Sequence, residues 1–487
     1  MPCNGLLYAP PHACGCYIAA KLTGFYALAP TRLGRAGLAP ERQRPDVRSQ
    51  KSERLERGPS YGTIENPKSK IENPHEWPTY RHDAQRSGCT PCPVPVVLRR
   101  RWQADVGGKL TSPTVADGKV FVASVDEHRI CAIDADSGLP MWDFTAGARV
   151  DSPPTLYANR AIFGCRDGYV YSLRASDGAL AWRLRAAGAE RRITACGQIE
   201  SATPLYGSVL VLAPASSDAN RGSGQDSTAY FTAGRSSYLD GGIDLYRIQV
   251  ETGKTLSRTP IYSPDPETGK QPEQYGPAYM PGALGEILTS DDQYIYLRDM
   301  VFDKRGGSQP KGNPHLLALT GFLDDSWTHR SYWIFGTRCS ISTGCSGQDR
   351  GLIYGRLLVF DESMICGYGR RRVHWSNQLQ DAAYRLFAVK RSEGTVQWTK
   401  PTTIQVRAML LANKVLLVAG LSAEPGDGPE ERNEDRRALL MAISASDGSE
   451  LGQYRLDSSP VFDGIAAANG RLYLSMENGG VVCMAGY

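Results

Sequence analysis

The sequence predicts an all-β fold made of repeated four-stranded sheets, and three observations support this prediction. The stretch AIDADSGLPMW ends at Trp142, and the similar stretch SLRASDGALAW ends forty residues later at Trp182. Short apolar runs with alternating polar residues, bounded by Gly and Asp turns, are typical of antiparallel strands. The 51 Gly, 31 Pro and 24 Tyr also favour a turn-rich β protein.

The forty-residue register extends beyond these two tryptophans. Trp102 lies one period before Trp142, and TSPT at 111–114 precedes DSPP at 151–154 by the same interval. Each unit contains segments such as KVFVAS, RICAIDADSG and MWDFTA, which read as four strands of about five residues separated by turns. A fixed period of this length marks a repeat architecture. The periodic residues therefore predict packing rather than a reaction centre.

The repeated phrase fits the pattern Ala-x-Asp-x-x-x-Gly-x-x-x-Trp. The glycine supplies the positive φ of a tight hairpin turn, and the tryptophan then lies on the outer strand. Its large flat ring can wedge between one sheet and the next. A related segment keeps the spacing at Ala442, Ser444 and Gly448 but has Gly452 in place of the tryptophan. The residues expected to dock the sheets together are Trp102, Gly138, Trp142, Gly178, Trp182, Gly394 and Trp398.

This pattern resembles the tryptophan-docking motif of the bacterial pyrroloquinoline-quinone (PQQ)-like, or quinoprotein-type, β-propellers. The resemblance covers about 93–487 and implies a ring of about seven four-stranded blades. The units are 109–147, 149–187, 198–258, 281–336, 354–399, 403–456 and an incomplete last unit. Eight blades stay possible because insertions enlarge several units.

The ring requires a strand from the beginning of the repeat region to complete its last blade. The last unit, GRLYLSMENGGVVCMAGY, stops where a tryptophan-bearing outer strand should follow. VVLRRRWQADVGG at 96–108 is such a strand, and it has no unit of its own. We expect it to close the ring, which removes open sheet edges.

The chain divides into three segments. Residues 1–30 resemble the tail of a blade, so we expect the end of a preceding propeller there, with an extra hairpin on the ring as the alternative. Residues 31–76 are charged and interrupted by prolines, which predicts a flexible linker. We expect residues 77–487 to form the PQQ-like propeller, and WPTYRHDAQRSG resembles the segment that leads into such propellers. There, Trp77 and Tyr80 would pack against the ring.

Composition limits the classes of partner and the compartment. The 55 basic residues are interleaved with 51 acidic ones, so the net charge of +4 does not indicate nucleic-acid binding. No apolar run reaches the roughly 18 residues of a membrane-spanning helix, and the first residues do not form a recognisable signal peptide. Localisation stays open, although the resemblance implies the periplasm or the cell exterior.

The twelve cysteines are scattered, which indicates buried thiols and a few disulfides rather than a disulfide scaffold. Cys89 and Cys92 form one C-x-x-C pair. A structural zinc site usually needs two such pairs, so a disulfide or free thiols are favoured and no metal site is expected. Cys339 and Cys345 could form a loop disulfide or stay as free thiols.

Two classes of function follow from the resemblance. Quinoprotein dehydrogenases of this fold carry a vicinal Cys-Cys disulfide, a calcium ion and an Asp base, whereas other members are non-catalytic assembly factors. This sequence has no Cys-Cys pair and no C-x-x-C-H haem attachment. We therefore favour a monomeric, non-catalytic scaffold that binds a protein, peptide or small ligand at its rim or channel mouth. The alternative is a PQQ-dependent oxidoreductase that uses PQQ with calcium.

The stretches least like the repeat supply the candidate ligand or channel residues, because loops that depart from a scaffold often carry its function. AERRITACGQIESATP and FTAGRSSYLDGGIDLY flank or enter the third unit, and LDDSWTHRSYW lies in the fourth. The alternative is that their charges form surface or interblade ion pairs. No catalytic or cofactor-binding residue is identified. The candidates are Arg191, Arg192, Glu200, Arg235, Asp240, His329 and Arg330.

Overall fold

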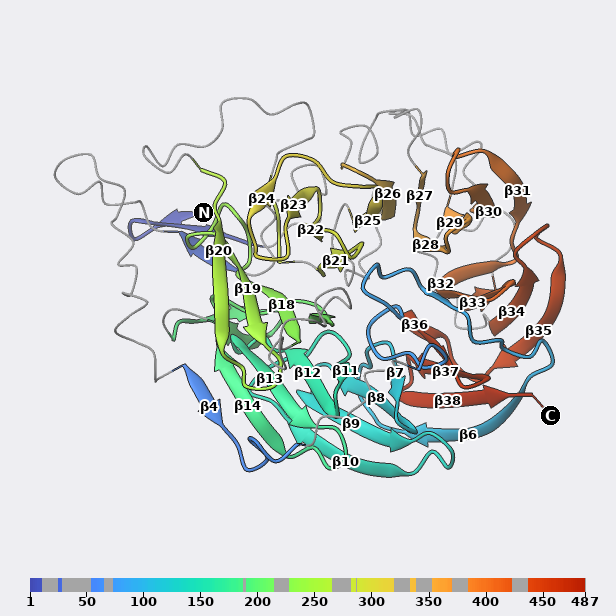
Figure 1. Cartoon of the computed structure of the whole chain (residues 1–487), viewed down its shortest axis with the longest axis horizontal. Helices are drawn as coiled ribbons and strands as arrows, with labels where there is room; N and C mark the ends of the chain where they lie inside the picture. The colour runs from blue at the N-terminus through green and yellow to red at the C-terminus, as the bar shows by residue number, and fades with distance from the viewer. Residues whose placement is uncertain are drawn as a thin grey trace, which may run out of the picture.

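A computed structural model describes most of the repeat region and parts of the residues before it. All elements in these residues are strands, arranged as sheets around a common centre (Figure 1). The predicted β-propeller is therefore confirmed. The described ranges hold no helix long and apolar enough to span a membrane. These ranges are 1–10, 25–28, 54–64, 73–186, 190–213, 227–264, 282–285, 287–318, 333–338, 353–369, 384–422 and 437–486.

Eight sheets in this part of the chain form the blades, which we number in chain order. Blade 1 contains β7 (Thr114–Ala116), β8 (Lys119–Ser124), β9 (Arg129–Asp134) and β10 (Pro140–Thr145), and blade 2 contains β11 (Thr155–Tyr157), β12 (Arg160–Gly164), β13 (Tyr169–Arg174) and β14 (Leu180–Arg185). Blade 3 contains β17 (Leu210–Leu212), β18 (Thr228–Ala233), β19 (Ile243–Gln249) and β20 (Thr255–Ile261), and blade 4 contains β21 (Thr289–Ser290), β22 (Ile295–Leu297), β23 (Met300–Phe302) and β24 (Ser308–Gln309). Blade 5 contains β25 (His315–Ala318), β26 (Trp333–Gly336) and β27 (Ile353–Gly355), and blade 6 contains β28 (Leu357–Phe360), β29 (Met364–Gly369), β30 (Arg385–Lys390) and β31 (Val396–Pro401). Blade 7 contains β32 (Ile404–Ala412), β33 (Val415–Ser422), β34 (Ala438–Ser444) and β35 (Glu450–Leu456), and blade 8 contains β36 (Pro460–Ala468), β37 (Arg471–Met476), β38 (Gly480–Ala485) and β6 (Arg99–Asp105).

Other strands lie before the ring or are added to its blades. The first sheet consists of β1 (Pro2–Cys3), β2 (Leu6–Ala9) and β3 (Tyr26–Leu28). The two-stranded hairpin between blades 2 and 3 consists of β15 (Arg192–Ala195) and β16 (Gln198–Ser201). The strands added to blades 2 and 7 are β4 (Leu55–Arg57) and β5 (Cys89–Thr90).

The ring has eight blades in the described residues, the larger of the two numbers that the sequence left open. The unit predicted at 281–336 contains all of blade 4 and the first two strands of blade 5. The strands of blade 4 are only two or three residues long. Because strands this short give little alternation, the boundary between the two blades was not visible in the sequence.

The ring closes as predicted, with an N-terminal strand completing the last blade. β6 pairs antiparallel with β38, and Trp102 lies opposite Cys483. The innermost strands of successive blades are neighbours where the ring closes: β32 lies beside β36, β36 beside β7, and β7 beside β11. The blade completed by both ends of the repeat region therefore joins the first blade to the seventh.

Four tryptophans hold neighbouring blades together in the same way. Each indole covers a positive-φ glycine in a turn of the next blade, and its Nε1 donates to the carbonyl oxygen three residues before that glycine. A Cβ on any of these glycines would lie 2.6–2.7 Å from the ring. The donor and acceptor pairs are Trp102 and Ala135 at 3.0 Å, Trp142 and Ala175 at 3.2 Å, Trp182 and Val250 at 3.1 Å, and Trp398 and Ala445 at 2.8 Å. The covered glycines are Gly138, Gly178, Gly253 and Gly448.

Two positions of the pattern behave differently. Gly394 makes the same positive-φ turn, at φ 66°, but no described atom comes within 4 Å of a Cβ built on it. Gly452 stands where blade 7 would carry its tryptophan. Blade 8 has no hairpin joining its last two strands, since β38 and β6 come from opposite ends of the repeat region. A tryptophan at 452 would therefore have no turn to dock on, and Tyr454 bonds to the backbone of Val96 there instead.

Residues 77–90, which we call the central segment, cross the middle of the ring, where Figure 1 draws a blue trace. Trp77 and Tyr80 are buried, as the resemblance predicted for the segment that leads into the ring. The segment contacts all eight blades. Its partners in blades 1 to 8 are, in order, Val115, Thr155, Ser208, Ser290, Trp333, Phe360, Leu411 and Asp463.

Part of the segment predicted as a linker is instead placed against blade 2. β4 pairs antiparallel with β14, and Trp182 lies opposite Arg57. Leu55, Tyr61 and Ile64 pack into the hydrophobic core shared by blades 2 and 3. The composition did not predict this strand, because the stretch around it is charged and contains few apolar residues.

Candidate functional site

The β15–β16 hairpin is an insertion between the last strand of blade 2 and the first strand of blade 3. Its two-residue turn, Cys196 and Gly197, has positive φ at both positions, 51° and 76°, as a tight hairpin of this type requires. Register pairs Ile193 with Glu200. The hairpin thereby carries Glu200 towards the turns of the neighbouring blades.

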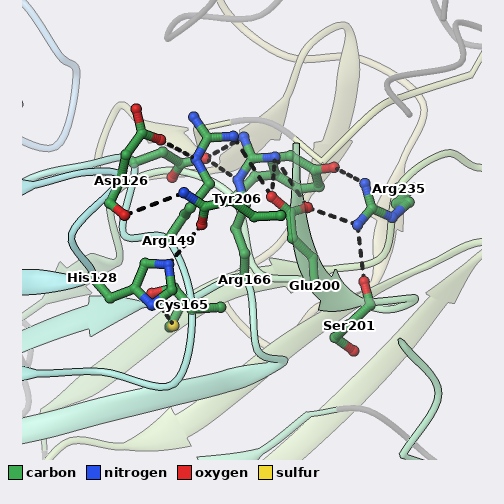
Figure 2. A network of polar contacts seen from close by, with 12 residues as sticks. Asp126, His128, Arg149, Cys165, Arg166, Glu200, Ser201, Tyr206 and Arg235 are labelled. Atoms are coloured by element: carbon green, nitrogen blue, oxygen red, sulfur yellow. Dashed lines mark hydrogen bonds and ion pairs between the residues drawn. The ribbon is translucent and has the colours of Figure 1, made fainter. Parts of the chain in front are cut away.

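The Glu200 carboxylate is completely buried among three arginines (Figure 2). Arg235 Nη2 lies 2.8 Å from Oε2. Arg166 Nη1 lies 3.3 Å from Oε1, and Arg149 Nη1 lies 3.6 Å from the same oxygen. A buried carboxylate is costly unless it is paired and hydrogen-bonded, so the guanidinium groups make this position possible.

Two further carboxylates complete the charge balance. Arg166 Nη2 lies 2.7 Å from Asp151, and the guanidinium also lies 4.5 Å from the centre of the Tyr206 ring. Arg149 Nε lies 2.8 Å from Asp126. We call Arg149, Arg166, Arg235, Asp126, Asp151 and Glu200 the arginine–carboxylate network.

The three positive and three negative groups of this network offset one another. Burial alone would lower the pKa of Arg166, but Asp151, Tyr206 and Glu200 overcome this effect and raise it above its ordinary value. The nearby Cys165 is fully buried, and burial raises the pKa of its thiol well above the usual range. Its thiol faces the Ala148 carbonyl at 3.3 Å. A thiol in this state is a poor nucleophile, so these contacts are suited to holding structure.

The same hairpin is tied to three blades. Gln198 Oε1 lies 2.6 Å from His128 Nε2, and Gln198 Nε2 donates to the Asp126 carbonyl of blade 1 at 3.2 Å. The Ser201 amide donates to the Arg166 carbonyl of blade 2 at 2.8 Å. Arg235 of blade 3 donates to the Ser201 carbonyl at 2.9 Å. The inner side of the hairpin is therefore fixed.

The structure brings some of the predicted candidates together and separates others. Glu200 and Arg235 meet inside the network. Arg191 forms an exposed ion pair with Asp240 at 3.1 Å, and Arg192 forms one with Glu190 at 2.6 Å. His329 and Arg330 fall outside the ranges that the structure describes.

Sequence reasoning missed the residues that complete the network, because they lie in stretches that fit the repeat. These are Arg149, Arg166, Asp126 and Asp151, and Tyr206, whose ring packs against Arg166, was missed with them. A signal was nevertheless present. Asp126 and Arg166 are forty residues apart and occupy the same turn, between the second and third strands, in blades 1 and 2. Opposite charges at equivalent positions of adjacent blades predict an interblade ion pair network.

The fold family implies PQQ with calcium, and the described residues can be tested against that group. Calcium takes six to eight oxygen ligands from converging carboxylates and amides. No group of three or more His, Cys, Asp or Glu that could hold a metal occurs in the described ranges. Asp463, the buried carboxylate on the inner strand of blade 8, is engaged by Arg81 Nη1 at 2.9 Å. This set of donors does not fit a calcium-bound quinone.

Cys89 and Cys92 are both free thiols, one of the two states that the sequence left open. Cys339 and Cys345 are not among the residues placed by the structure. Burial raises the pKa of Cys89 to about 12, so this thiol is protonated near neutral pH.

Comparison with known proteins supports the same fold. Residues 99–225 match the family model described as outer membrane protein assembly factor BamB. No curated protein matches the chain significantly.

Solved structures of similar fold include dehydrogenases. Quinohemoprotein alcohol dehydrogenase from Comamonas testosteroni is 13% identical, with a TM-score of 0.53, over 84% of this chain and 80% of that one. A europium-containing methanol dehydrogenase is 11% identical, with a TM-score of 0.51, over 83% of this chain and 90% of that one. BamB from Moraxella catarrhalis is 11% identical, with a TM-score of 0.36, over 80% of this chain and 98% of that one. The docked tryptophans, the family model matched over residues 99–225 and these two dehydrogenase structures together show that the chain has the fold of the PQQ-like β-propellers.

Proposed function

We propose that this chain is a non-catalytic scaffold whose β15–β16 hairpin binds a protein partner. The observation that carries the proposal is the burial of Glu200 among three arginines. This contact fixes the inner side of an insertion that the ring itself does not need. The opposite side of the hairpin is left for recognition.

The outer side of the hairpin has the composition of a contact surface. Ile199 is 64% exposed, and the side chains of Arg191 and Arg192 are 66% and 67% exposed. Arginine is enriched at interfaces, and a rigid element loses little entropy on binding. The arginines of the network are neutralised by its carboxylates, so a partner would meet an exposed apolar side chain beside Arg191 and Arg192, each held in a surface ion pair. Acidic residues of the partner would compete for these two arginines with Asp240 and Glu190. A segment with an apolar residue beside acidic ones fits this surface.

The matched family model supports this choice of class. Its description is an assembly factor rather than an enzyme. The similar dehydrogenase structures support the fold alone, because one fold hosts both kinds of function. The poor fit of the described donors to calcium also favours the scaffold.

Site-specific photo-crosslinking tests the proposal. A photoreactive amino acid at position 199 should give a discrete adduct in cells that express the full chain. The same amino acid at Leu139, which is 66% exposed at the other end of blade 1, should give none. Arg192→Glu should weaken the adduct at 199, and the Arg192 side chain is exposed enough for the ring to keep its thermal stability. No adduct at 199, or equal adducts at both positions, would contradict the proposal.

The oxidoreductase alternative predicts a different result. Incubation of the purified chain with PQQ and calcium should then give a bound chromophore and dye-linked oxidation of alcohols. The scaffold proposal expects neither. The bound chromophore and the oxidation of alcohols are measured on the same purified chain, so cofactor binding and activity can be compared directly.

A further inference from the structure

We propose that the outer edge of blade 2 is a binding site for an extended peptide, and that residues 54–64 occupy it within the same chain. We call these residues the strap. The ligand class is a peptide that carries Leu-Glu at its start, followed by a glycine and a serine at the spacing of Leu55, Glu56, Gly58 and Ser60.

The backbone of the strap binds by strand addition. The Gly58 amide donates to the Ala181 carbonyl at 2.8 Å, and the Ser60 amide donates to the Leu180 carbonyl at 3.0 Å. In return, the Arg185 amide donates to the Arg54 carbonyl at 2.9 Å. Strand addition to a free sheet edge is a common way to recognise peptides, with backbone bonds for affinity and side-chain contacts for specificity.

Blade 2 does not need this strand to be complete. Blades 1, 3 and 6 each consist of four strands and end at β10, β20 and β31, with no fifth strand from the described residues. Blade 2 already has four strands of its own before β4 is added. The strap therefore occupies an edge rather than filling a gap in the blade.

The first two side chains of the strap are recognised separately. Leu55 packs at the seam where Trp182 covers Gly253, and a Cβ on Gly253 would meet Leu55 Cδ1 at 2.8 Å. Glu56 Oε2 accepts hydrogen bonds from Arg183 Nη2 at 2.5 Å and from Nε at 2.8 Å. The first contact is thus apolar, and the second is an ion pair between partly exposed side chains.

The later positions of the strap select by size and by hydrogen bonding. A Cβ on Gly58 would lie 2.2 Å from the Leu180 carbonyl oxygen, so glycine alone fits there. Ser60 Oγ donates to the Ala179 carbonyl at 2.9 Å. Four requirements of different chemistry within six residues are more than a structural spacer needs, and they are what a sequence-selective site contains.

A peptide in trans would compete with the strap. A tethered segment has an effective concentration on the order of 1 mM. The intact chain should therefore bind a free peptide of residues 52–66 roughly 100-fold more weakly than a chain whose strap is released. The Leu55→Asp/Gly58→Val double variant of the full chain releases the strap by removing the apolar contact and adding a clash.

The experiment measures binding of a fluorescein-labelled 52–66 peptide by anisotropy. Hydrogen exchange of residues 54–64 reports release of the strap, and thermal unfolding reports an intact ring. The double variant should show fast exchange in the strap, an unchanged ring and peptide binding at micromolar concentration. Adding Arg183→Glu should weaken that binding about tenfold, and a peptide with Glu56→Arg should restore it. Adding Arg100→Glu, whose exposed side chain pairs with Asp457 in another blade, should have no effect.

Two results would overturn the proposal. One is a folded double variant with an exchanging strap that does not bind the peptide. The other is a strap that stays protected in the double variant, because Leu55 and Gly58 would then not determine occupancy. The outcome is independent of crosslinking at Ile199, which lies on the separate β15–β16 hairpin.

Discussion

The indole of Trp142 covers Gly178 so closely that a Cβ on this glycine would lie 2.6 Å from a ring carbon. Trp142 belongs to blade 1 and Gly178 to the third-to-fourth-strand turn of blade 2. The indole Nε1 also donates to the Ala175 carbonyl of that turn at 3.2 Å. The seam between the blades therefore combines a hydrogen bond with a fit that only glycine allows.

Gly178→Ala should lower the free energy of unfolding by about 2–4 kcal/mol, from overpacking against the indole and from strain at positive φ. Gly394→Ala is the matched control, because Gly394 makes the same turn with no described atom within 4 Å of its Cβ position. It should lose only about 1 kcal/mol from backbone strain. Urea unfolding monitored by tryptophan fluorescence measures both. Equal losses would show that the indole contact does not limit stability.

Glu200→Gln should destabilise the chain by about 3 kcal/mol, because it removes the buried charge that faces three guanidinium groups. Hydrogen exchange should also become faster in the β15–β16 hairpin, which this carboxylate anchors. Glu190→Gln on the same insertion removes an exposed carboxylate from Arg192 and should change stability by less than about 0.5 kcal/mol. A similar loss for both variants would mean that burial of Glu200 is not what fixes the hairpin.

The buried pair of Arg81 and Asp463 should couple the central segment strongly to blade 8. Both side chains are at most 3% exposed, and Arg81 Nη1 contacts both carboxylate oxygens at 2.9 and 3.0 Å. A double-mutant cycle with Arg81→Met and Asp463→Asn should give a coupling energy above about 2 kcal/mol. The exposed pair Arg100 and Asp457 should give less than about 1 kcal/mol. A coupling energy as small as that of the exposed pair would show that backbone hydrogen bonds, and not this ion pair, hold the central segment.

The sequence revealed the seams that depend on residues close together in the chain. A positive-φ turn needs glycine, and the tryptophan follows it at a fixed spacing, so blades 1 and 2 could be read directly. Closure by the strand around Trp102 also followed, since an outer strand without a unit matched a unit without an outer strand. The glycine–tryptophan spacing is a local pattern, and the closing strand follows from counting the strands in each unit.

Other features depend on contacts that no local pattern contains. Glu200 is stabilised by Arg149 and Arg166 of blade 2 and by Arg235 of blade 3, and only folding brings these together. Blades 4 and 5 were merged because their seam carries no tryptophan in the described residues. The strap was missed because a single leucine in a charged stretch does not predict a strand. Its packing partner, Trp182, is more than a hundred residues away in the sequence.

Thiol labelling should report whether the closing seam between β38 and β6 opens. Burial raises the pKa of Cys483 to about 11, and it lies opposite Trp102 in that seam. A raised thiol pKa disfavours the reactive thiolate below that value, so at pH 8 only roughly 0.1% would be ionised, about 100-fold less than for an ordinary thiol. Iodoacetamide at pH 8 should therefore label the exposed Cys3 and Cys196 first, as measured by mass spectrometry of peptides. Cys483 is also completely buried, so its labelling in the folded chain should stay slow, and in denaturant it should match Cys196. Rapid labelling of Cys483 at pH 8 in the folded chain would mean that the last blade separates from β6 and that the ring is open there.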